Sequence, residues 1–352
     1  MQHKYSAAVV GCGAGGNLSI DALATSELFE LVAVCDMRSE ATAAVAARYP
    51  GVRTFADYQT MFVACPVDVV CVSTYAPTHA EIAHAALTLP LKGILLEKPL
   101  TDSVQTARAL LDVIEQRGLP MIVPHGLMAH THSREILQRV HAGEIGELKL
   151  IEIEFGGWDT FNAGPHTFNF VVALTGNAPV DWVMSACESS TRTYRDGMQV
   201  ETTSITYVQT KQGIRMVMQA GDEVSPNIPG KGVVYRIIGT AGMIEFYMWE
   251  NAYRLFNATH PSGELIVPTP LPMSVHQYLL EQLADMITSG KSDYSIAEAS
   301  FIASEICEAA YLSNRHQCKV LFPVTDFIPP AKPVWDPGTP YRGTGGGRDG
   351  RY

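Results

Sequence analysis

The chain has 352 residues, of which 47% are hydrophobic and 17% are charged, a balance typical of a globular protein with more than one domain. Its net charge of -11 argues against a nucleic-acid partner and against binding to an anionic membrane surface, because both need clustered Lys and Arg. The 7 cysteines include no C-x-x-C pair, which argues against a disulfide framework and against a zinc site.

No charged and apolar leader precedes the first predicted strand, and no apolar run reaches the roughly 18 residues that a membrane span needs. We therefore expect a cytoplasmic protein with reduced thiols that acts on a small molecule.

Short β-rich runs alternate with helical patterns from residue 5 to about residue 124. This alternation predicts a parallel sheet with helices on both faces. We predict strands at residues 6–10, 31–35, 69–73, 93–97 and 121–124, and helices near 15–26, 39–48, 78–88 and 103–117. Thr78 and Glu81 form a capping-box pattern that predicts the start of the third helix.

The first strand leads into a glycine-rich turn that precedes a helix. Gly11, Gly13 and Gly16 have the spacing of a dinucleotide fingerprint, with Cys12 and Asn17 as further candidate contacts. Glycine permits a tight turn and lets the backbone approach a pyrophosphate, whose charge meets the helix N-terminal amides. The alternative is an ordinary glycine-rich turn.

Asp36 ends the second predicted strand, 20 residues after Gly16. A carboxylate at this place accepts hydrogen bonds from the adenosine ribose and repels a 2′-phosphate, which favours NAD over NADP. Two alternatives stay open, since Asp36 could be a solvated acid at a strand end, and Arg38 could accommodate that phosphate. We interpret residues 1–124 as an α/β Rossmann dinucleotide-binding domain that binds NAD.

The pattern changes after Pro124, where long strands follow a single helix around Arg134 and Val140. We predict strands at residues 148–155, 180–187, 202–209, 214–218, 233–238, 242–247 and 252–256, and closing helices at 276–288 and 296–313, the second opened by a capping box at 295–298. Residues 125–322 are therefore predicted to form an α+β C-terminal domain with a large, mostly antiparallel open sheet. Residues 323–352 are rich in Pro and Gly and predict an arm or a loose tail.

Two segments carry a resemblance to a known family. Val72-Ser73-Thr74-Tyr75-Ala76-Pro77-Thr78-His79 follows the third strand, and Leu96-Glu97-Lys98-Pro99-Leu100 follows the fourth. With the hairpin at residues 236–245, the chain resembles the glucose-fructose oxidoreductase, inositol dehydrogenase and rhizopine-catabolism (Gfo/Idh/MocA) family over residues 5 to about 320.

The resemblance implies several contacts with the cofactor and the substrate. Cofactor contacts are implied at Ser73, Thr74, Tyr75, His79, Glu97 and Lys98. It also implies that Lys98 reaches the reacting substrate oxygen, and that the open sheet joins subunits into a homodimer or homotetramer.

The residues themselves support a role for Lys98. Strand ends of an open parallel sheet point into the crevice where ligands bind. An ammonium there can polarise a carbonyl or stabilise a developing alkoxide. The alternative is a lysine that caps the end of a strand.

The family supplies Asp-x-x-x-His from a helix, and this chain has Asn162 and His166 at that spacing. If helical, the two share one face. His166 is the natural acceptor of a hydroxyl proton, whereas Asn162 can orient a ligand but carries no charge. Asn169 stands where many relatives carry a second aspartate, so two carboxylates are missing.

Other side chains of this region have two interpretations each. Asp159 is a substitute for the missing charge or a helix cap. Trp158 is a sugar-stacking face or interdomain core. His125, His130 and His132 are substrate or nicotinamide contacts or polar loop residues. No carboxylate or cysteine at ligand spacing accompanies them, so no metal site is predicted.

The leading hypothesis is an NAD-dependent oxidoreductase that transfers a hydride between a secondary hydroxyl of a sugar, cyclitol or sugar derivative and the nicotinamide. A second is a redox-neutral lyase, glycosidase or epimerase that oxidises its substrate transiently with bound NAD. A third is a protein that binds NAD and a sugar without turnover. NADH release and substrate conversion discriminate among them.

Overall fold

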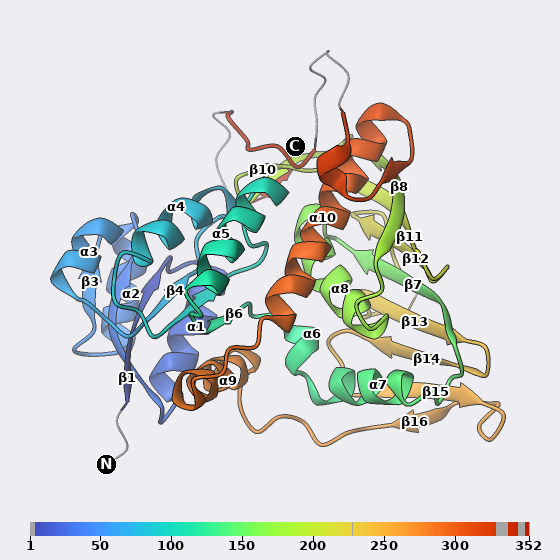
Figure 1. Ribbon diagram of the computed structural model, residues 1–352, viewed down its shortest axis with the longest axis horizontal. Coiled ribbons are helices and arrows are strands. Elements are labelled where there is room, and N and C mark those ends of the chain that lie inside the picture. Colours follow the sequence, from blue (N-terminus) through green and yellow to red (C-terminus); the bar gives the residue numbers. More distant parts are fainter. Residues whose placement is uncertain (1–3, 227, 329–336, 344–348, 352) are drawn as a thin grey trace. The chain divides into compact units, whose positions relative to one another are not determined.

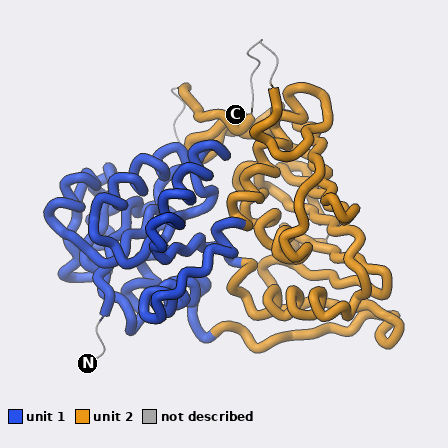
Figure 2. Tube along the Cα trace, viewed as in Figure 1, with its two compact units in different colours: residues 1–126, 272–298 blue, residues 127–271, 299–352 orange. Residues whose placement is uncertain are grey.

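The computed structural model describes residues 4–226, 228–328, 337–343 and 349–351, which belong to two compact units (Figure 2). The first unit comprises Met1–Gly126 and Pro272–Glu298, and the second comprises Leu127–Leu271 and Ala299–Tyr352. The predicted division at residue 124 differs in one respect, because the chain returns to the first unit over Pro272–Glu298. A proline-rich stretch, Pro268, Pro270 and Pro272, lies where the chain returns.

The first unit is built on a six-stranded parallel sheet with strand order β3-β2-β1-β4-β5-β6 (Figure 1). Its strands are β1 (Tyr5–Val10), β2 (Phe29–Cys35), β3 (Arg53–Phe55), β4 (Val69–Val72), β5 (Gly93–Leu96) and β6 (Met121–Ile122). Its helices are α1 (Ala14–Thr25), α2 (Ser39–Arg48), α3 (Tyr58–Ala64), α4 (Ala76–Ala86), α5 (Val104–Gln116), α6 (Gly126–Ala129, which ends in the second unit) and α9 (Val275–Ser289). The predicted parallel sheet is confirmed, whereas β3 and α3 were not predicted.

Continuous burial explains why β4 and β5 appear in the sequence as unbroken apolar runs. Every residue of both strands is buried, as expected for central strands with helices on both faces. By contrast, β3 has three partly or fully exposed residues and is too short to show a pattern.

The predicted start of helix α4 at Thr78 is wrong. The helix begins at Ala76 with Tyr75 as its N-cap. Pro77 fits the first turn, where a missing N–H costs no hydrogen bond. The Thr78 hydroxyl instead donates to the Tyr75 carbonyl at 2.9 Å.

The second unit contains a nine-stranded sheet with strand order β16-β15-β14-β13-β7-β12-β11-β8-β17. Its strands are β7 (Leu148–Gly156), β8 (Val180–Glu188), β11 (Thr203–Thr210), β12 (Arg215–Gly221), β13 (Val233–Gly239), β14 (Gly242–Tyr247), β15 (Tyr253–Asn257), β16 (Glu264–Ile266) and β17 (Val320–Leu321). Only the β7–β12 pair is parallel among the pairs described, which confirms the mostly antiparallel sheet. All seven predicted strands are present, with small differences at their ends, and the short edge strands β16 and β17 were missed.

Helices α7 (Thr131–His141) and α8 (Thr160–Leu174) and most of α10 (Ser295–His316) belong to the second unit. Strand β7 alternates buried residues with partly exposed ones, such as Phe155 and Glu154. Buried residues of α8 and α10 share one hydrophobic core with the inward residues of the sheet. Within it, the rings of Tyr235 and Phe246 stack with centroids 4.7 Å apart. This packing holds α8 rigidly, and α8 carries two candidate site residues.

The predicted capping box at residues 295–298 is only partly correct. Helix α10 does begin at Ser295. However, the Glu298 carboxylate accepts a hydrogen bond from Arg108 Nη1 at 2.8 Å instead of closing the box.

The C-terminal segment is docked wherever it is described. Strand β18 (Asp349–Arg351) joins β9 (Arg192–Arg195) and β10 (Met198–Gln199) in a three-stranded sheet. Tyr341 stacks on Tyr194 with ring centroids 4.2 Å apart. The described parts therefore form an arm, whereas Pro329, Pro330, Pro333 and Gly345 to Gly347 of the predicted segment lie outside the described residues.

Three predictions from the sequence concern a membrane span, a metal site and disulfides. Among the described residues, no helix has both the length and the apolar character to cross a membrane. In the same part of the chain, no group of three or more His, Cys, Asp or Glu side chains is placed to hold a metal ion. All seven cysteines are free thiols, and most are buried.

Candidate active site

The glycine turn between β1 and α1 has the geometry that a dinucleotide needs. Gly11 has φ 98°, and a side chain there would collide with the Ser73 carbonyl. A side chain at Gly16 would collide with the Gly11 carbonyl, whereas nothing lies within 4 Å of the position that a side chain of Gly13 would take. Gly11 and Gly16 thus let the turn pack tightly, and Gly13 leaves room beside the backbone.

Helix α1 begins at this turn, and no side chain caps it. The reversal of strand order between β1 and β4 places the turn at the switch point of the sheet. At the end of β4, the buried Ser73 Oγ has no hydrogen-bond partner among the described residues. A buried polar atom normally has one. The open backbone, the uncapped helix and Ser73 together fit a bound pyrophosphate and its sugar.

Cys12 and Asn17 brace the turn. The Asn17 amide nitrogen donates to the carbonyls of Cys12 and Gly13, both at 2.8 Å. Burial and the charge of Asp36 raise the pKa of the Cys12 thiol to about 12, so it stays neutral. Their side chains therefore hold the shape of the loop.

Asp36 ties the end of β2 to the same turn. Its Oδ2 accepts the Cys12 N–H at 2.8 Å, and its Oδ1 accepts the Arg38 N–H at 2.9 Å. The Arg38 guanidinium lies on both carboxylate oxygens at 3.2 Å. Burial alone would raise the pKa of Asp36, but the bonds from Arg38 and Cys12 lower it. The structure thus presents an ionised Asp36 whose charge holds Arg38.

Three further predicted cofactor contacts follow Ser73. Thr74 is half-buried and its hydroxyl bonds to that of Thr78 at 2.8 Å, while Tyr75 is exposed. His79 is buried, with Nδ1 2.9 Å from the Pro99 carbonyl and Nε2 3.0 Å from the Thr74 carbonyl. His79 therefore links the loop after β4 to the loop after β5.

Glu97 and Lys98 follow β5. The buried Glu97 carboxylate contacts His276 Nε2 of α9 at 3.2 Å and accepts the Lys98 N–H at 3.2 Å. Burial would raise the pKa of Glu97, but His276, Lys98 and His79 outweigh it and lower this pKa. The carboxylate lies next to Gly15, where a side chain would come within 3.3 Å of it. Glu97 thus connects α9, the glycine turn and the peptide that carries Lys98.

Lys98 itself is half-buried at the carboxyl end of β5, and the Lys98-Pro99 peptide is cis. Its position agrees with a side chain that serves a ligand at the end of the sheet.

The three histidines after β6 have different surroundings, with His125 in the first unit and His130 and His132 in the second. Burial and the positive charge of Lys98 lower the pKa of the fully buried His125 to about 3, so it is neutral. In the second unit, His132 stacks on His130 with ring centroids 5.3 Å apart and also packs against Phe246. His132 is thus buried against Phe246 of the hydrophobic core.

In the second unit, the start of α8 gathers a second set of candidate residues. Asp159 caps the helix by accepting the Asn162 N–H at 3.0 Å. The Asn162 amide nitrogen also donates to both Asp159 oxygens, at 3.0 and 3.1 Å. Asp159 is therefore both a cap and a buried charge. Asn162 and His166 lie in one helix at a spacing of four, as the prediction required.

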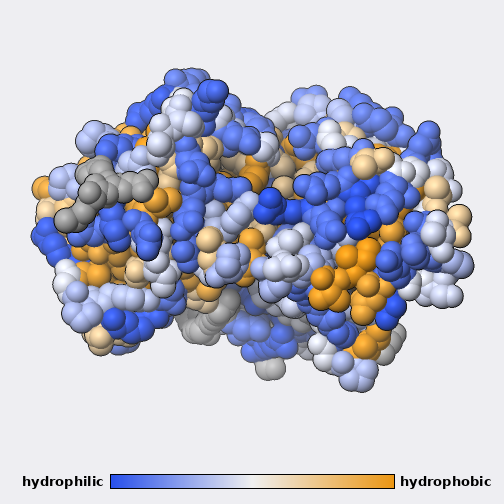
Figure 3. All heavy atoms as spheres, turned by 90° about the horizontal axis from the view of Figure 1, so that it is seen from below, coloured by the Kyte–Doolittle hydropathy of each residue, from blue (hydrophilic) through white to orange (hydrophobic). Residues whose placement is uncertain are grey.

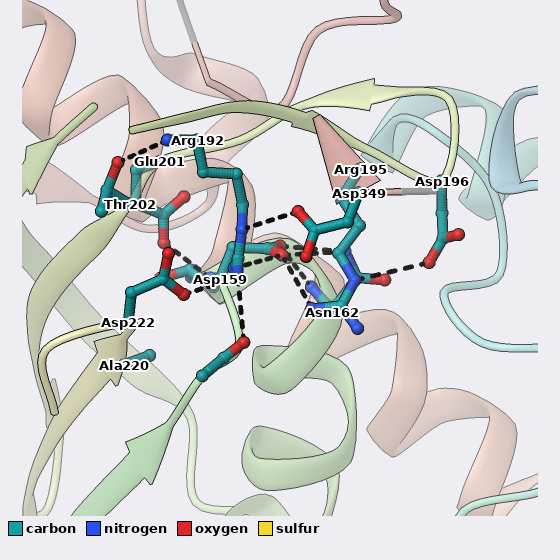
Figure 4. A network of polar contacts seen from close by, with 12 residues as sticks. Asp159, Asn162, Arg192, Arg195, Asp196, Glu201, Thr202, Ala220, Asp222 and Asp349 are labelled. Carbon is teal, nitrogen blue, oxygen red and sulfur yellow. Dashed lines mark hydrogen bonds and ion pairs between the residues drawn. The ribbon is translucent and has the colours of Figure 1, made fainter. Parts of the chain in front are cut away.

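A second buried acid lies at the same helix start. Glu201 accepts the Thr160 N–H at 2.6 Å and the Tyr311 hydroxyl at 2.8 Å. Burial and the charge of Glu201 raise the pKa of Asp159 to about 6, although Asn162, Arg195 and Arg192 oppose the shift. Figure 4 shows the side chains of Arg192, Arg195 and Asn162 gathered around the Asp159 carboxylate. The two carboxylates anchor the first turn of α8.

Trp158 is half-buried and is surrounded by three side chains. Its ring centroid lies 5.6 Å from that of Phe155 and 6.2 Å from that of His166, in a T-shaped arrangement. The Arg195 guanidinium lies over the indole, 4.7 Å from its centroid. Asn169 is fully buried in α8.

Sequence reasoning missed Arg192, Arg195, Glu201, Tyr311 and His276. The hairpin that carries both arginines had one usable signal, because Asp196-Gly197 is a typical tight-turn pair. Both turn residues have positive φ, 46° and 83°. For His276 no local signal exists, since its partner Glu97 is 179 residues away.

Known proteins resemble this chain in sequence. A family model described as an NAD-binding Rossmann oxidoreductase family (GFO_IDH_MocA) matches residues 5–125. The rhizopine catabolism protein MocA of Rhizobium meliloti is 24% identical over 324 residues, covering 87% of this chain and 94% of that protein. Inositol 2-dehydrogenase 3 of Saccharopolyspora erythraea is 34% identical over 119 residues, covering 33% of this chain and 34% of that protein.

D-Apiose dehydrogenase of Paraburkholderia graminis is 25% identical over 164 residues, covering 46% of this chain and 44% of that protein. The chain thus spans most of MocA but less than half of the two dehydrogenases.

Solved structures share the whole fold. A levoglucosan dehydrogenase in complex with NADH and levoglucosan has a TM-score of 0.77 at 16% identity, covering 91% of this chain and 100% of that one. An oxidoreductase from Agrobacterium radiobacter in complex with NAD+, L-tartaric acid and magnesium has a TM-score of 0.76 at 17% identity, covering 91% of this chain and 98% of that one. With the glycine turn, Asp36 and the Glu97-Lys98-Pro99 segment, these matches show that residues 5–125 form an NAD-binding Rossmann domain of the Gfo/Idh/MocA oxidoreductase type, and that the chain shares the fold of these solved oxidoreductases.

Proposed function

We propose that this oxidoreductase oxidises a secondary hydroxyl of a sugar, cyclitol or sugar derivative. The observation that carries the proposal is Lys98 at the carboxyl end of β5, in the same sheet as the glycine turn and Ser73. Carboxyl ends of strands near a switch point are where open α/β sheets bind ligands. Relatives named for inositol and apiose support a polyhydroxylated substrate.

The glycine turn, Asp36 and Ser73 are the residues that would hold NAD. When bound, this cofactor supplies the hydride acceptor. We assign to the Lys98 ammonium a contact with the reacting oxygen of the substrate. There it stabilises the negative charge that develops as the proton leaves. We assign to His166, in the second unit, the acceptance of a substrate proton. The Asp159 carboxylate accepts the hydrogens of the Asn162 side-chain amide. The side-chain oxygen of Asn162 is then left to accept a hydrogen bond from a substrate hydroxyl.

The test is Lys98→Met, assayed with NAD and a panel of sugars and cyclitols. Removing a charge-stabilising donor should lower kcat/KM on the order of 100-fold or more. NAD affinity should stay within a few-fold. Lys149→Met is the matched control, because Lys149 is exposed and pairs with Glu147 on the second unit. Near-normal kcat in Lys98→Met would overturn the assignment.

The redox-neutral hypothesis is the second candidate, and Asn162 favours it because the amide cannot carry the charge that strengthens a base. We expect NADH to accumulate in step with substrate loss in the wild-type enzyme. The measurement combines absorbance of the reduced nicotinamide with mass spectrometry of the product. Product without accumulated NADH would replace the dehydrogenase by an enzyme that recycles its cofactor.

A further inference from the structure

Arg195 carries a buried guanidinium whose hydrogen-bonding capacity is unused in the described part of the protein. The residue is only 9% exposed. Its contacts to carboxylates are two ion pairs, to Asp196 at 3.8 Å and to Asp159 at 3.9 Å, both beyond hydrogen-bond reach. Within the described residues its buried Nε has no hydrogen-bond partner. Buried polar groups are normally satisfied, so such a cation needs an explanation.

Arg192 on the same strand provides the comparison. It is also fully buried, but its Nη2 donates to the Gly157 carbonyl at 3.0 Å and to Asp222 at 2.6 Å. Asp349 and Asp159 lie 3.3 and 3.5 Å from its Nε and Nη1, although neither nitrogen makes a hydrogen bond within the described residues. Strand β9 therefore carries one arginine whose carboxylate partners lie at 2.6 to 3.5 Å and one whose partners lie at 3.8 and 3.9 Å.

The carboxylates around Arg195 are already engaged elsewhere. Asp159 accepts three hydrogen bonds from Asn162, and Glu201 accepts from Thr160 and Tyr311. Asp222 is shared between Arg192 and Arg351, the latter at 3.0 Å. Asp196, the remaining carboxylate near Arg195, stays at 3.8 Å, so no carboxylate of the described residues lies within hydrogen-bond distance of this guanidinium.

Trp158 places this cation beside the proposed base. The guanidinium lies 4.7 Å over the indole, and the indole meets the His166 ring at 6.2 Å. Arg195 and His166 therefore flank the same side chain. A guanidinium over an indole ring is attracted by the negative face of the ring, which favours this position of Arg195. Both groups therefore lie within one side chain's width of the indole of Trp158.

We propose that Arg195 binds a carboxylate of the substrate, which makes the substrate a sugar acid, a polyhydroxylated carboxylate. The planar fork of a guanidinium matches the two oxygens of a carboxylate, whereas a single hydroxyl satisfies one donor. The inference rests on the proposed function, because it names the class of substrate at the same site.

The experiment compares acids with neutral parents of the same ring. The acids are D-glucuronate, D-galacturonate and D-gluconate, and the neutral probes are D-glucose, D-galactose and myo-inositol. Binding to the NAD-loaded enzyme is measured by calorimetry, and oxidation is measured separately as kcat and KM. We expect the wild type to bind at least one acid roughly tenfold or more tightly than its neutral counterpart.

Two variants and one control carry the test. Arg195→Met keeps an apolar stem over Trp158 and should abolish the preference for acids, while binding of neutral probes stays within a few-fold. Arg195→Lys keeps the charge without the fork and should retain part of the preference. Arg215→Met removes an exposed arginine of β12 and should change nothing.

The outcomes separate this inference from the proposed function. If neutral sugars are oxidised and no acid is preferred, the assignment of Arg195 is overturned and the dehydrogenase stands. If acids bind with the Arg195-dependent preference but nothing is oxidised, the dehydrogenase fails and the acid site stands. If Arg195→Met and Arg195→Lys weaken acids and neutral sugars equally while both variants stay folded, Arg195 is a structural residue and the inference is overturned.

Discussion

At the scale of single residues, the Asp36 carboxylate has two functions in one place. It accepts the Cys12 N–H of the glycine turn, and it holds the Arg38 guanidinium on both of its oxygens. An arginine held in this way is not available to a 2′-phosphate. The charge of Asp36 would also repel that phosphate, so we predict that NAD binds more tightly than NADP.

Asp36→Asn tests this prediction, because the amide oxygen can still accept the Cys12 N–H while the charge is lost. NADP should gain roughly tenfold on NAD, since Arg38 is released and repulsion is removed. Fluorescence titration of both cofactors measures the ratio, with the surface change Asp21→Asn as control. If wild-type enzyme binds NADP more tightly, Arg38 governs cofactor choice instead.

A second prediction at this scale concerns the pH dependence of stability, and it rests on Asp159 and Glu201. Burial and the charge of Glu201 raise the pKa of Asp159 from 3.8 to about 6. The folded protein then binds this proton more tightly than the unfolded chain does. The contribution of Asp159 to stability is therefore greatest below pH 4 and is lost as pH rises to about 6.

Glu201→Gln should lower the pKa of Asp159 and shift that loss of stability to lower pH. Urea unfolding measured between roughly pH 4 and pH 7 gives the slope of the unfolding free energy for each variant. Glu188→Gln removes an exposed acid of the same unit and serves as control. Identical pH slopes in the two variants would show that Glu201 does not act on Asp159.

At the scale of elements, strand β18 holds the hairpin that carries both buried arginines. Asp349 pairs with Arg195 along the strand, and its carboxylate lies 3.3 Å from Arg192 Nε. Gly350 packs so closely on Tyr194 that any side chain would collide with the ring. The arm is thus a structural support of the start of α8, reached through Arg192 and Asp159.

Gly350→Val should therefore detach β18 and loosen the hairpin. We expect faster hydrogen exchange at residues 192–199 and a several-fold higher KM, with kcat changed less. Gly232→Val is the control, since nothing lies within 4 Å of the position that its side chain would take. Unchanged exchange in the hairpin would mean that β18 does not hold it.

At the scale of the whole molecule, the nine-stranded sheet has an outer face with exposed apolar side chains. Trp182 stacks on Tyr207 with centroids 5.1 Å apart, while Met184 and Ile205 are 49% and 48% exposed. Figure 3 draws one face of the molecule, on which apolar residues (orange) gather among hydrophilic ones (blue). Exposed apolar patches of this kind favour association, so we predict a homodimer or homotetramer through this sheet.

Ile205→Glu tests the prediction, because a charge in a dry interface is costly. Light scattering should report an oligomer for the wild type and a smaller species for the variant. Met37→Glu alters an exposed residue of the first unit, 91% exposed, and should leave the mass unchanged. A monomeric wild type would contradict the prediction.

The sequence by itself determined the features whose causes are local. The buried runs of β1, β4 and β5 predicted the parallel sheet, because strands covered on both faces are continuously apolar. Gly11 has a positive φ and Gly16 packs closely on the backbone, so the turn needs glycine at both positions. The spacing of the glycines was therefore enough to predict the turn. For the same reason the apolar run of β5 is enough to place Lys98 at a strand end.

Only the tertiary structure decided which groups face one another. Glu97 meets His276, which lies 179 residues away, and Asp159 meets Arg192 from a separate hairpin. The raised pKa of Asp159 depends on burial and on Glu201, neither of which has a local signature. These contacts follow from strand pairing and from how much water the fold excludes, and both are properties of the packed chain rather than of any segment of its sequence.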